Sequence, residues 1–328
     1  MKKFFASILS PLRSPLLLVL VAFLYYCFVS EDVTGDLGRN AQIVFSKEYR
    51  MQNEFEENIQ KELYWCSTEE LKNYDLVFMG DSFTKLCFPY YLTNMLHKNT
   101  AKYFAENIKS PEQTFVSLCN IDAIMPKVVV LESVERSCID RLINLDFNPS
   151  SSVQPIAAVY KEGDDKQTNF TTFYKNQIID NQSVRHLHLK DSLFSCPKKE
   201  KDLYFYHEDL HWATDEEINI AISKIDTLFA LANKKHIQLF YVIAADKYDV
   251  YQDFAIDNMY QRQTVLDSFA QFDSSLYFVN TKPILIKKAE KGVKDLYYAD
   301  DSHWSPVGAR IVSEEIVKRM DSLVVFPY

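Results

Sequence analysis

Short apolar runs rich in β-branched residues alternate with helical patterns along most of the chain, as expected of an α/β protein. Five runs are typical of buried strands: Leu76–Met79, Thr114–Leu118, Lys127–Leu131, Ile237–Ala244 and Leu276–Val279. Helical patterns cover Pro89–Leu96, Asp215–Asn233, Ile256–Phe272 and Val307–Asp321. The alternation predicts a doubly wound, mostly parallel, five-stranded sheet flanked by helices.

Two polar stretches interrupt this alternation. Residues 31–72 carry one apolar stripe at four-residue spacing, which predicts a helical connector. Residues 140–205 are rich in Asn, Ser, Asp and Lys, which indicates an insertion that covers the active-site edge or forms a partner-binding flap. We therefore expect one catalytic domain over residues 73–328, with an insertion at about 140–205.

The N-terminal residues 1–30 have the charge pattern of a membrane anchor. Lys2, Lys3 and Arg13 precede the uncharged residues 14–30, and acidic residues follow. This run lies at the lower limit of the about 17–25 residues that span a bilayer. The asymmetry predicts a cytoplasmic tip and a single-pass helix in the inner membrane, with the rest on the periplasmic, extracytoplasmic side. A retained anchor is favoured, and a cleaved signal peptide is the alternative.

Composition limits the classes of partner and cofactor. A net charge of −9 and the lack of a basic stripe argue against nucleic acid. With 20 Tyr and 23 Phe, the chain can supply exposed aromatics to a sugar-binding cleft. There is no C-x-x-C pair, so we expect neither a metal site nor a cofactor. The cysteines outside the anchor could form disulfides or remain buried thiols.

The first candidate for chemistry is the tetrapeptide Gly80-Asp81-Ser82-Phe83, which directly follows the predicted strand Leu76–Met79. A serine at this position lies at the carboxyl edge of a parallel sheet, where open α/β folds bind ligands. The start of a helix there offers backbone N–H groups to an oxyanion. Ser82 is therefore a candidate nucleophile, and the alternative is a simple helix N-cap.

The second candidate is Asp301-Ser302-His303-Trp304, which follows the strand-like run Leu296–Ala299 and precedes a helix. His303 would be the general base that takes the serine proton, and Asp301 would orient its ring. Asp300 is a rival for the orienting role. One glycine of only six stands beside each motif, Gly80 and Gly308, which suggests that the backbone needs them there.

A second Asp-x-His-Trp string competes for the same serine. Asp209 and His211 lie in residues 202–212, which echo residues 295–304. This block precedes the strand Ile237–Ala244. In a simple strand order, a block at that position does not place a catalytic base beside Ser82, so a structural role is favoured for Asp209 and His211. His211 could still line the cleft.

These motifs resemble those of a known family. Residues 80–83 resemble the nucleophile block of the SGNH hydrolase superfamily. Residues 301–309 are similar to the Asp-x-His-Trp block of its alginate O-acetyltransferase (AlgJ/AlgX-like) branch. Residues 126–136 and 245–251 are similar to two further segments of the same branch. The matches span residues 75–320 apart from the insertion, and they imply an SGNH/flavodoxin-like sheet.

The resemblance implies an extracytoplasmic enzyme that forms an acetyl-serine and passes the acetyl group to a polysaccharide hydroxyl. A multi-span membrane partner would deliver the acetyl groups.

Two features of this sequence depart from that branch. In the branch, the Asp-x-His block precedes the serine, whereas here it follows, as in ordinary SGNH esterases. The usual Gly and Asn oxyanion blocks are also not visible. The substrate or oxyanion candidates are Asp81, Asn120, Arg136 and Trp304. Asn120 could instead cap a turn, and Arg136 could form a structural ion pair.

Two other functions fit the same residues. A carbohydrate acetylesterase would use the same triad with water as the acceptor. An inactive SGNH-like module would bind glycan or act as a scaffold in an export complex.

Overall fold

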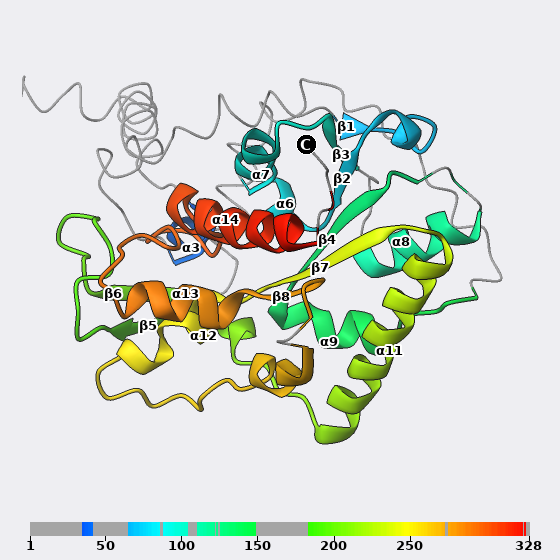
Figure 1. The fold of residues 1–328 in the computed structure, drawn as a ribbon. Helices are drawn as coiled ribbons and strands as arrows, with labels where there is room; N and C mark the ends of the chain where they lie inside the picture. The colour runs from blue at the N-terminus through cyan, green and yellow to red at the C-terminus, as the bar shows by residue number, and fades with distance from the viewer. Residues whose placement is uncertain are drawn as a thin grey trace, which may run out of the picture.

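A six-stranded parallel sheet forms the centre of the protein, with strands in the order β1-β3-β2-β4-β7-β8 (Figure 1). The computed structural model describes residues 35–41, 65–85, 88–103, 110–148 without 122 and 124, 183–272, 275–323 and 325. The strands are β1 (Trp65–Cys66), β2 (Leu76–Met79), β3 (Thr100–Tyr103), β4 (Val128–Val134), β7 (Gln238–Ala244) and β8 (Phe278–Asn280). The expectation of a mostly parallel sheet is confirmed, although the sheet has one strand more than the five predicted.

Helices cover the sheet in two packed groups. One group consists of α7 (Phe88–Leu96), α13 (Thr281–Ala289) and α14 (Pro306–Ser322), and the other of α8 (Pro111–Asn120), α9 (Glu135–Ile143) and α11 (Asp215–Lys234). Between them, every residue of β2 and β4 is buried, as parallel strands covered on both faces require. Three short helices complete the site region: α3 (Asp36–Ala41), α6 (Ser82–Lys85) and α12 (Lys247–Tyr251).

The strand order reverses between β2 and β4. From β2 the chain crosses to β3 on one side, and β4 then pairs with β2 on its other side. Open α/β sheets bind their ligands at the carboxyl ends of the strands at such a reversal. Ser82 follows β2 at this point, and Glu135 and Lys247 open the helices that follow β4 and β7.

The strand predicted at Thr114–Leu118 is wrong, because these residues belong to α8. Ser110 caps this helix by accepting a hydrogen bond from Gln113 N, and Pro111 occupies its first turn. These caps outweigh the β-branched composition of the run. The sheet instead contains β3, which was not predicted because the charged residue Lys102 interrupts its apolar pattern, although Lys102 is buried.

Two other predicted elements differ from the structure. The helix expected over Ile256–Phe272 is reduced to the 3-10 segment Leu266–Phe272, because the Gln252 side chain hydrogen-bonds both the N–H and the carbonyl oxygen of Gln263 and holds the preceding residues in a loop. The strand-like run Leu296–Ala299 joins no sheet. It forms a tight turn, closed by one antiparallel bridge between Tyr297 and Trp304.

The part of the insertion that the structure describes contains a separate two-stranded antiparallel sheet, β5 (Val184–His188) and β6 (Asp202–Tyr206). The 3-10 turn His207–Asp209 follows β6 directly. The anchor predicted at residues 14–30 and most of the predicted connector lie outside the described residues. Within the described ranges, no helix is both long enough and apolar enough to cross a membrane.

Candidate active site

The turn that carries Ser82 is held by the carboxylate of Asp81. Asp81 Oδ1 accepts a hydrogen bond from Phe83 N at 3.2 Å, and its Oδ2 accepts from Val134 N and Arg141 Nη1, both at 2.9 Å. The ion pair with Arg141 and these hydrogen bonds lower the pKa of Asp81 against the opposing effect of burial. Asp81 was a substrate candidate, but its oxygens tie α6 to the end of β4.

Gly80 allows a buried glutamate to reach the same turn. Glu132 Oε2 accepts hydrogen bonds from Asp81 N at 3.1 Å, Thr84 N at 3.2 Å and Thr84 Oγ1 at 2.9 Å. A Cβ at Gly80 would lie 2.1 Å from Thr84 Oγ1 and 2.5 Å from Glu132 Oε2, so only glycine fits. The N–H groups of Phe83 and Thr84 are therefore engaged, which leaves fewer backbone donors for an oxyanion than the sequence suggested.

Asp301 and His303 form the hydrogen bond expected of an orienting acid and a general base. Asp301 Oδ1 lies 2.5 Å from His303 Nδ1 and accepts a second hydrogen bond from His303 N at 3.1 Å. A proton on Nδ1 leaves the lone pair on Nε2, which is buried and has no hydrogen-bond partner among the described residues. Burial lowers the pKa of His303, but the hydrogen bond and charge of Asp301 outweigh it, and the net shift is upward.

Phe83 connects the serine turn to this dyad. Its ring centroid lies 4.9 Å from that of His303 and 4.9 Å from that of Trp304. Because Phe83 is the residue after Ser82, the two distant motifs meet at one edge of the sheet. The second glycine is also explained, since a Cβ at Gly308 would lie 2.1 Å from Leu296 O, inside the turn that carries the dyad.

The structure adds a second carboxylate that the sequence did not reveal. Asp36, in α3, accepts hydrogen bonds from Ser302 N at 2.8 Å and from Ser302 Oγ at 2.5 Å. Its Oδ2 lies 3.8 Å from His303 Nδ1, and its N–H donates to Asp301 Oδ2 at 3.1 Å. Burial, and next the charge of Asp301, raise the pKa of Asp36. No local pattern marks Asp36, because it sits in the stretch expected to be a connector.

Lys247 stabilises the turn that carries Asp301 and His303. Its Nζ donates to the carbonyl oxygens of Tyr298, Ala299 and Asp301 at 2.7, 3.0 and 3.2 Å. Burial lowers the pKa of Lys247 to about 8. The segment 245–251 was noted for its resemblance to a family motif, yet no role for this lysine followed from sequence alone.

The competing Asp209–His211 block is arranged differently. Asp209 Oδ1 binds Arg136 Nη1 at 3.3 Å, and the same nitrogen binds Asp246. Both ring nitrogens of His211 are buried and lack a hydrogen-bond partner in the described part of the chain. Asp209 therefore pairs with Arg136 and does not orient His211. Arg136 still lies near the carboxyl edge of the sheet, in the first turn of α9 after β4, and its charge opposes the upward shift in the pKa of His303.

The structure gives neither of the two remaining candidates a contact with substrate. Asn120 is the exposed last residue of α8, where its Nδ2 donates to Phe147 O at 2.9 Å. This end of α8 leads into the start of β4, whereas Ser82 lies at the carboxyl edge. Trp304 is 1% exposed, and its Nε1 donates to Tyr297 Oη at 3.2 Å, so it packs in the core and does not face a substrate.

Comparison with known proteins finds one family that resembles part of the chain. Residues 203–325 match the family model of the SGNH hydrolase-like domain, acetyltransferase AlgX. The matched region contains both Asp-x-His-Trp blocks and Lys247, and it ends before reaching Ser82 on the N-terminal side. No curated protein and no solved structure matches the chain. Over residues 203–325, the chain is thus similar to the SGNH hydrolase-like acetyltransferase domain, which supports an enzyme of the acyltransferase or esterase type.

Proposed function

We propose that this protein is an O-acetyltransferase that moves an acetyl group through an acetyl-Ser82 intermediate to a hydroxyl of an exported or cell-surface polysaccharide. The Asp301–His303 hydrogen bond carries the proposal, because it leaves Nε2 as the free base beside the turn of Ser82. The match to an acetyltransferase domain supports the choice of acyl group.

In the first half-reaction, His303 Nε2 takes the proton of Ser82 as Oγ attacks the acetyl carbonyl of the donor. The imidazolium that forms is stabilised by Asp301 and, 3.8 Å away, by Asp36. His303 then returns the proton to the departing donor group. Acetyl-Ser82 remains, and the free histidine is regenerated.

In the second half-reaction, a sugar hydroxyl attacks the acetyl-serine while His303 takes its proton. Collapse of the tetrahedral intermediate returns this proton to Ser82 Oγ and releases the acetylated glycan. We assign stabilisation of the oxyanion to the backbone N–H of Ser82 and to the positive charge of Arg136, whose side chain is 18% exposed.

The proposed setting follows from the N-terminal sequence. Residues 14–30 would anchor the enzyme in the inner membrane, with the domain on the extracytoplasmic side. One anchor cannot carry a cytoplasmic acetyl donor across the bilayer. A multi-span membrane partner therefore supplies the acetyl group in this proposal.

The test is acetylation of Ser82 by an activated acetyl ester. Mass spectrometry of the intact protein should show one acetyl group on Ser82 in the wild type and none in Ser82→Ala. The label should be discharged onto an added polysaccharide. If acetate is released at the same rate with and without added sugar, the protein is instead an acetylesterase. Esterases of this superfamily have the same order of motifs as this chain, with the Asp-x-His block after the serine. An unlabelled wild type would indicate an inactive module.

A further inference from the structure

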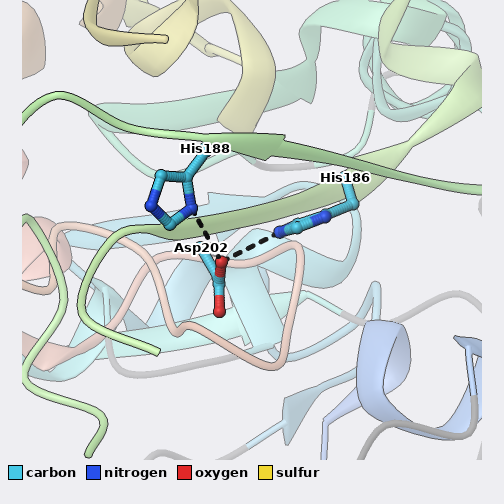
Figure 2. A group of neighbouring side chains, drawn as sticks. All are labelled: His186, His188 and Asp202. Atoms are coloured by element: carbon cyan, nitrogen blue, oxygen red, sulfur yellow. Dashed lines mark hydrogen bonds and ion pairs between the residues drawn. The ribbon is translucent and has the colours of Figure 1, made fainter. Parts of the chain in front are cut away.

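The hairpin β5–β6 gathers two histidines and an aspartate outside the candidate active site. His186 and His188 are two residues apart on β5, so they point to the same face of the strand. The antiparallel register places His188 opposite Asp202 of β6. Figure 2 shows both imidazole rings directed at the Asp202 carboxylate.

The three side chains converge on one oxygen atom. His186 Nε2 lies 3.0 Å and His188 Nδ1 3.2 Å from Asp202 Oδ1. The three ligand atoms all lie within 4.8 Å of one another. Two ligands bound tetrahedrally to one zinc ion, each about 2.0–2.1 Å from it, are about 3.3 Å apart. The observed spacing therefore needs only small rotations of exposed side chains to admit an ion.

We propose that His186, His188 and Asp202 form a binding site for a divalent transition-metal ion of the zinc class. Two imidazole nitrogens and one carboxylate oxygen are a donor set suited to Zn²⁺, and too rich in nitrogen for Mg²⁺ or Ca²⁺. The site lies in a protein of net charge −9, which favours a cation.

Besides these rotations, binding requires a change of tautomer in both histidines. In the metal-free hairpin, each imidazole places a nitrogen against Asp202 Oδ1 and shares a proton with it. In the bound form, His186 Nε2 and His188 Nδ1 direct lone pairs at the ion, and their protons move to the opposite ring nitrogens. The imidazole side chains are 48% and 59% exposed, so those nitrogens can reach water.

The hairpin backbone holds the ligands in register. The Tyr204 ring stacks on His186 with centroids 4.6 Å apart and planes at 18°. Ile256 N donates to His188 O at 2.7 Å, which fixes the outer strand to the neighbouring loop. On the opposite face, Leu187, Leu203 and Phe205 are buried. The scaffold is ordered, while the exposed rings leave one or two coordination positions to water or to a group from a partner.

The site also lies on a strand that leads to the candidate active site. Asp202 begins β6 and Tyr206 ends it, four residues or about 13 Å further along. Tyr206 Oη accepts a hydrogen bond from Asn40 Nδ2 of α3, the helix that delivers Asp36. An ion at the hairpin would thus brace the strand against which α3 packs.

The test uses the untagged full chain, stripped with a chelator and titrated with ZnCl₂ by calorimetry. We expect one site, and Co²⁺ in its place should give d–d absorption bands of a tetrahedral N/O site. The double variant His186→Ala/His188→Ala should weaken zinc binding by more than about 100-fold. Asp202→Asn keeps the side chain's size and should also weaken it.

Two controls make the result decisive. His236→Asn alters an exposed histidine remote from the cluster, at a backbone φ of 58° that Asn accepts, and should bind zinc like the wild type. The group Asp36, Asp301 and His303 also offers three ligand atoms. Zinc binding that persists in the double variant and disappears in Asp301→Asn would place the ion there and overturn the proposal. So would a wild type that binds no zinc.

Discussion

Asp36 Oδ1 accepts a hydrogen bond from Ser302 N at 2.8 Å, across 266 residues of sequence. This contact brings a second carboxylate beside His303, the proposed general base. Two acids on one imidazole stabilise its charged form more than one acid does. Asp36 is therefore a positioning residue with an electrostatic effect on the base, and its removal should be visible in a pH profile.

The first prediction concerns the acid limb of that profile. A base must be neutral to accept a proton, and the pKa of His303 is raised above its usual 6.5. Transfer of an acetyl group from an activated ester should therefore rise with pH through a midpoint above 6.5. Asp36→Asn removes one charge that raises this pKa, so its midpoint should lie lower. An unchanged midpoint in Asp36→Asn would contradict the assignment.

Asp301→Asn is the reference for this comparison. It should move the midpoint further down, because the direct hydrogen bond is lost as well as the charge. It should also lower the rate by about 10³–10⁴-fold, since an amide favours the wrong histidine tautomer.

The second prediction decides between the two Asp-x-His blocks. His303→Ala should lower the formation of acetyl-Ser82 by about 10³-fold or more, because no oriented base remains. His211→Ala should stay within about tenfold of the wild type, because Asp209 binds Arg136 in place of the His211 ring. Stopped-flow measurement of acetyl-enzyme formation gives both values. The reverse ranking would move the catalytic role to His211.

The third prediction concerns Lys247. Lys247→Met removes the amine that donates to three backbone carbonyl oxygens, two of them in fully buried contacts, which should lower the free energy of unfolding by about 2–3 kcal/mol. The turn that holds Asp301 would also shift, with a loss of activity of about 100-fold. Urea unfolding and the acetyl-ester assay test both effects. Lys287→Met, on the exposed side of α13, is the matched control and should change neither.

A pH effect distinguishes the buried charge of Lys247 from a purely steric role. The pKa of Lys247 is lowered from 10.5 to about 8, so the unfolded chain binds more protons between these values. The stability of the wild type should therefore rise, relative to Lys247→Met, as the pH increases from about 8 to 10.5. A constant difference across this range would show that the lysine is not charged differently in the two states.

The fourth prediction tests the close approach at Gly80. A Cβ there would lie 2.1 Å from Thr84 Oγ1, so Gly80→Ala should destabilise the fold by about 1–3 kcal/mol. The serine turn should be displaced with it, and acetylation of Ser82 should fall. Gly292→Asn is the control, because a Cβ at that position meets no atom within 4 Å and Asn tolerates its φ of 74°. Equal stability of the two variants would refute the packing argument.

The sequence predicted the elements whose signals are local and uniform. β4 opens with four consecutive apolar residues, Val128–Leu131, and β7 is apolar after its first residue. α11 begins with a capping box between Thr214 and Glu217. The Asp301–His303 pair could also be predicted, because only Ser302 separates its members and the motif is distinctive. Prediction failed at α8, where a β-branched run lies inside a capped helix, and at β3, where Lys102 interrupts a buried strand.

By itself, then, the sequence determined the alternating α/β architecture, the serine turn and a short list of acids and bases, because strand burial, helix caps and tight turns depend on neighbouring residues. Only the tertiary structure decided which acid serves which base. Asp209 forms an ion pair with Arg136, Asp301 forms a hydrogen bond with His303, and Asp36, from the N-terminal part of the chain, lies close to the same histidine. Such pairings depend on distances between elements that are remote in sequence, and the packing of β2, α3 and the dyad turn sets those distances.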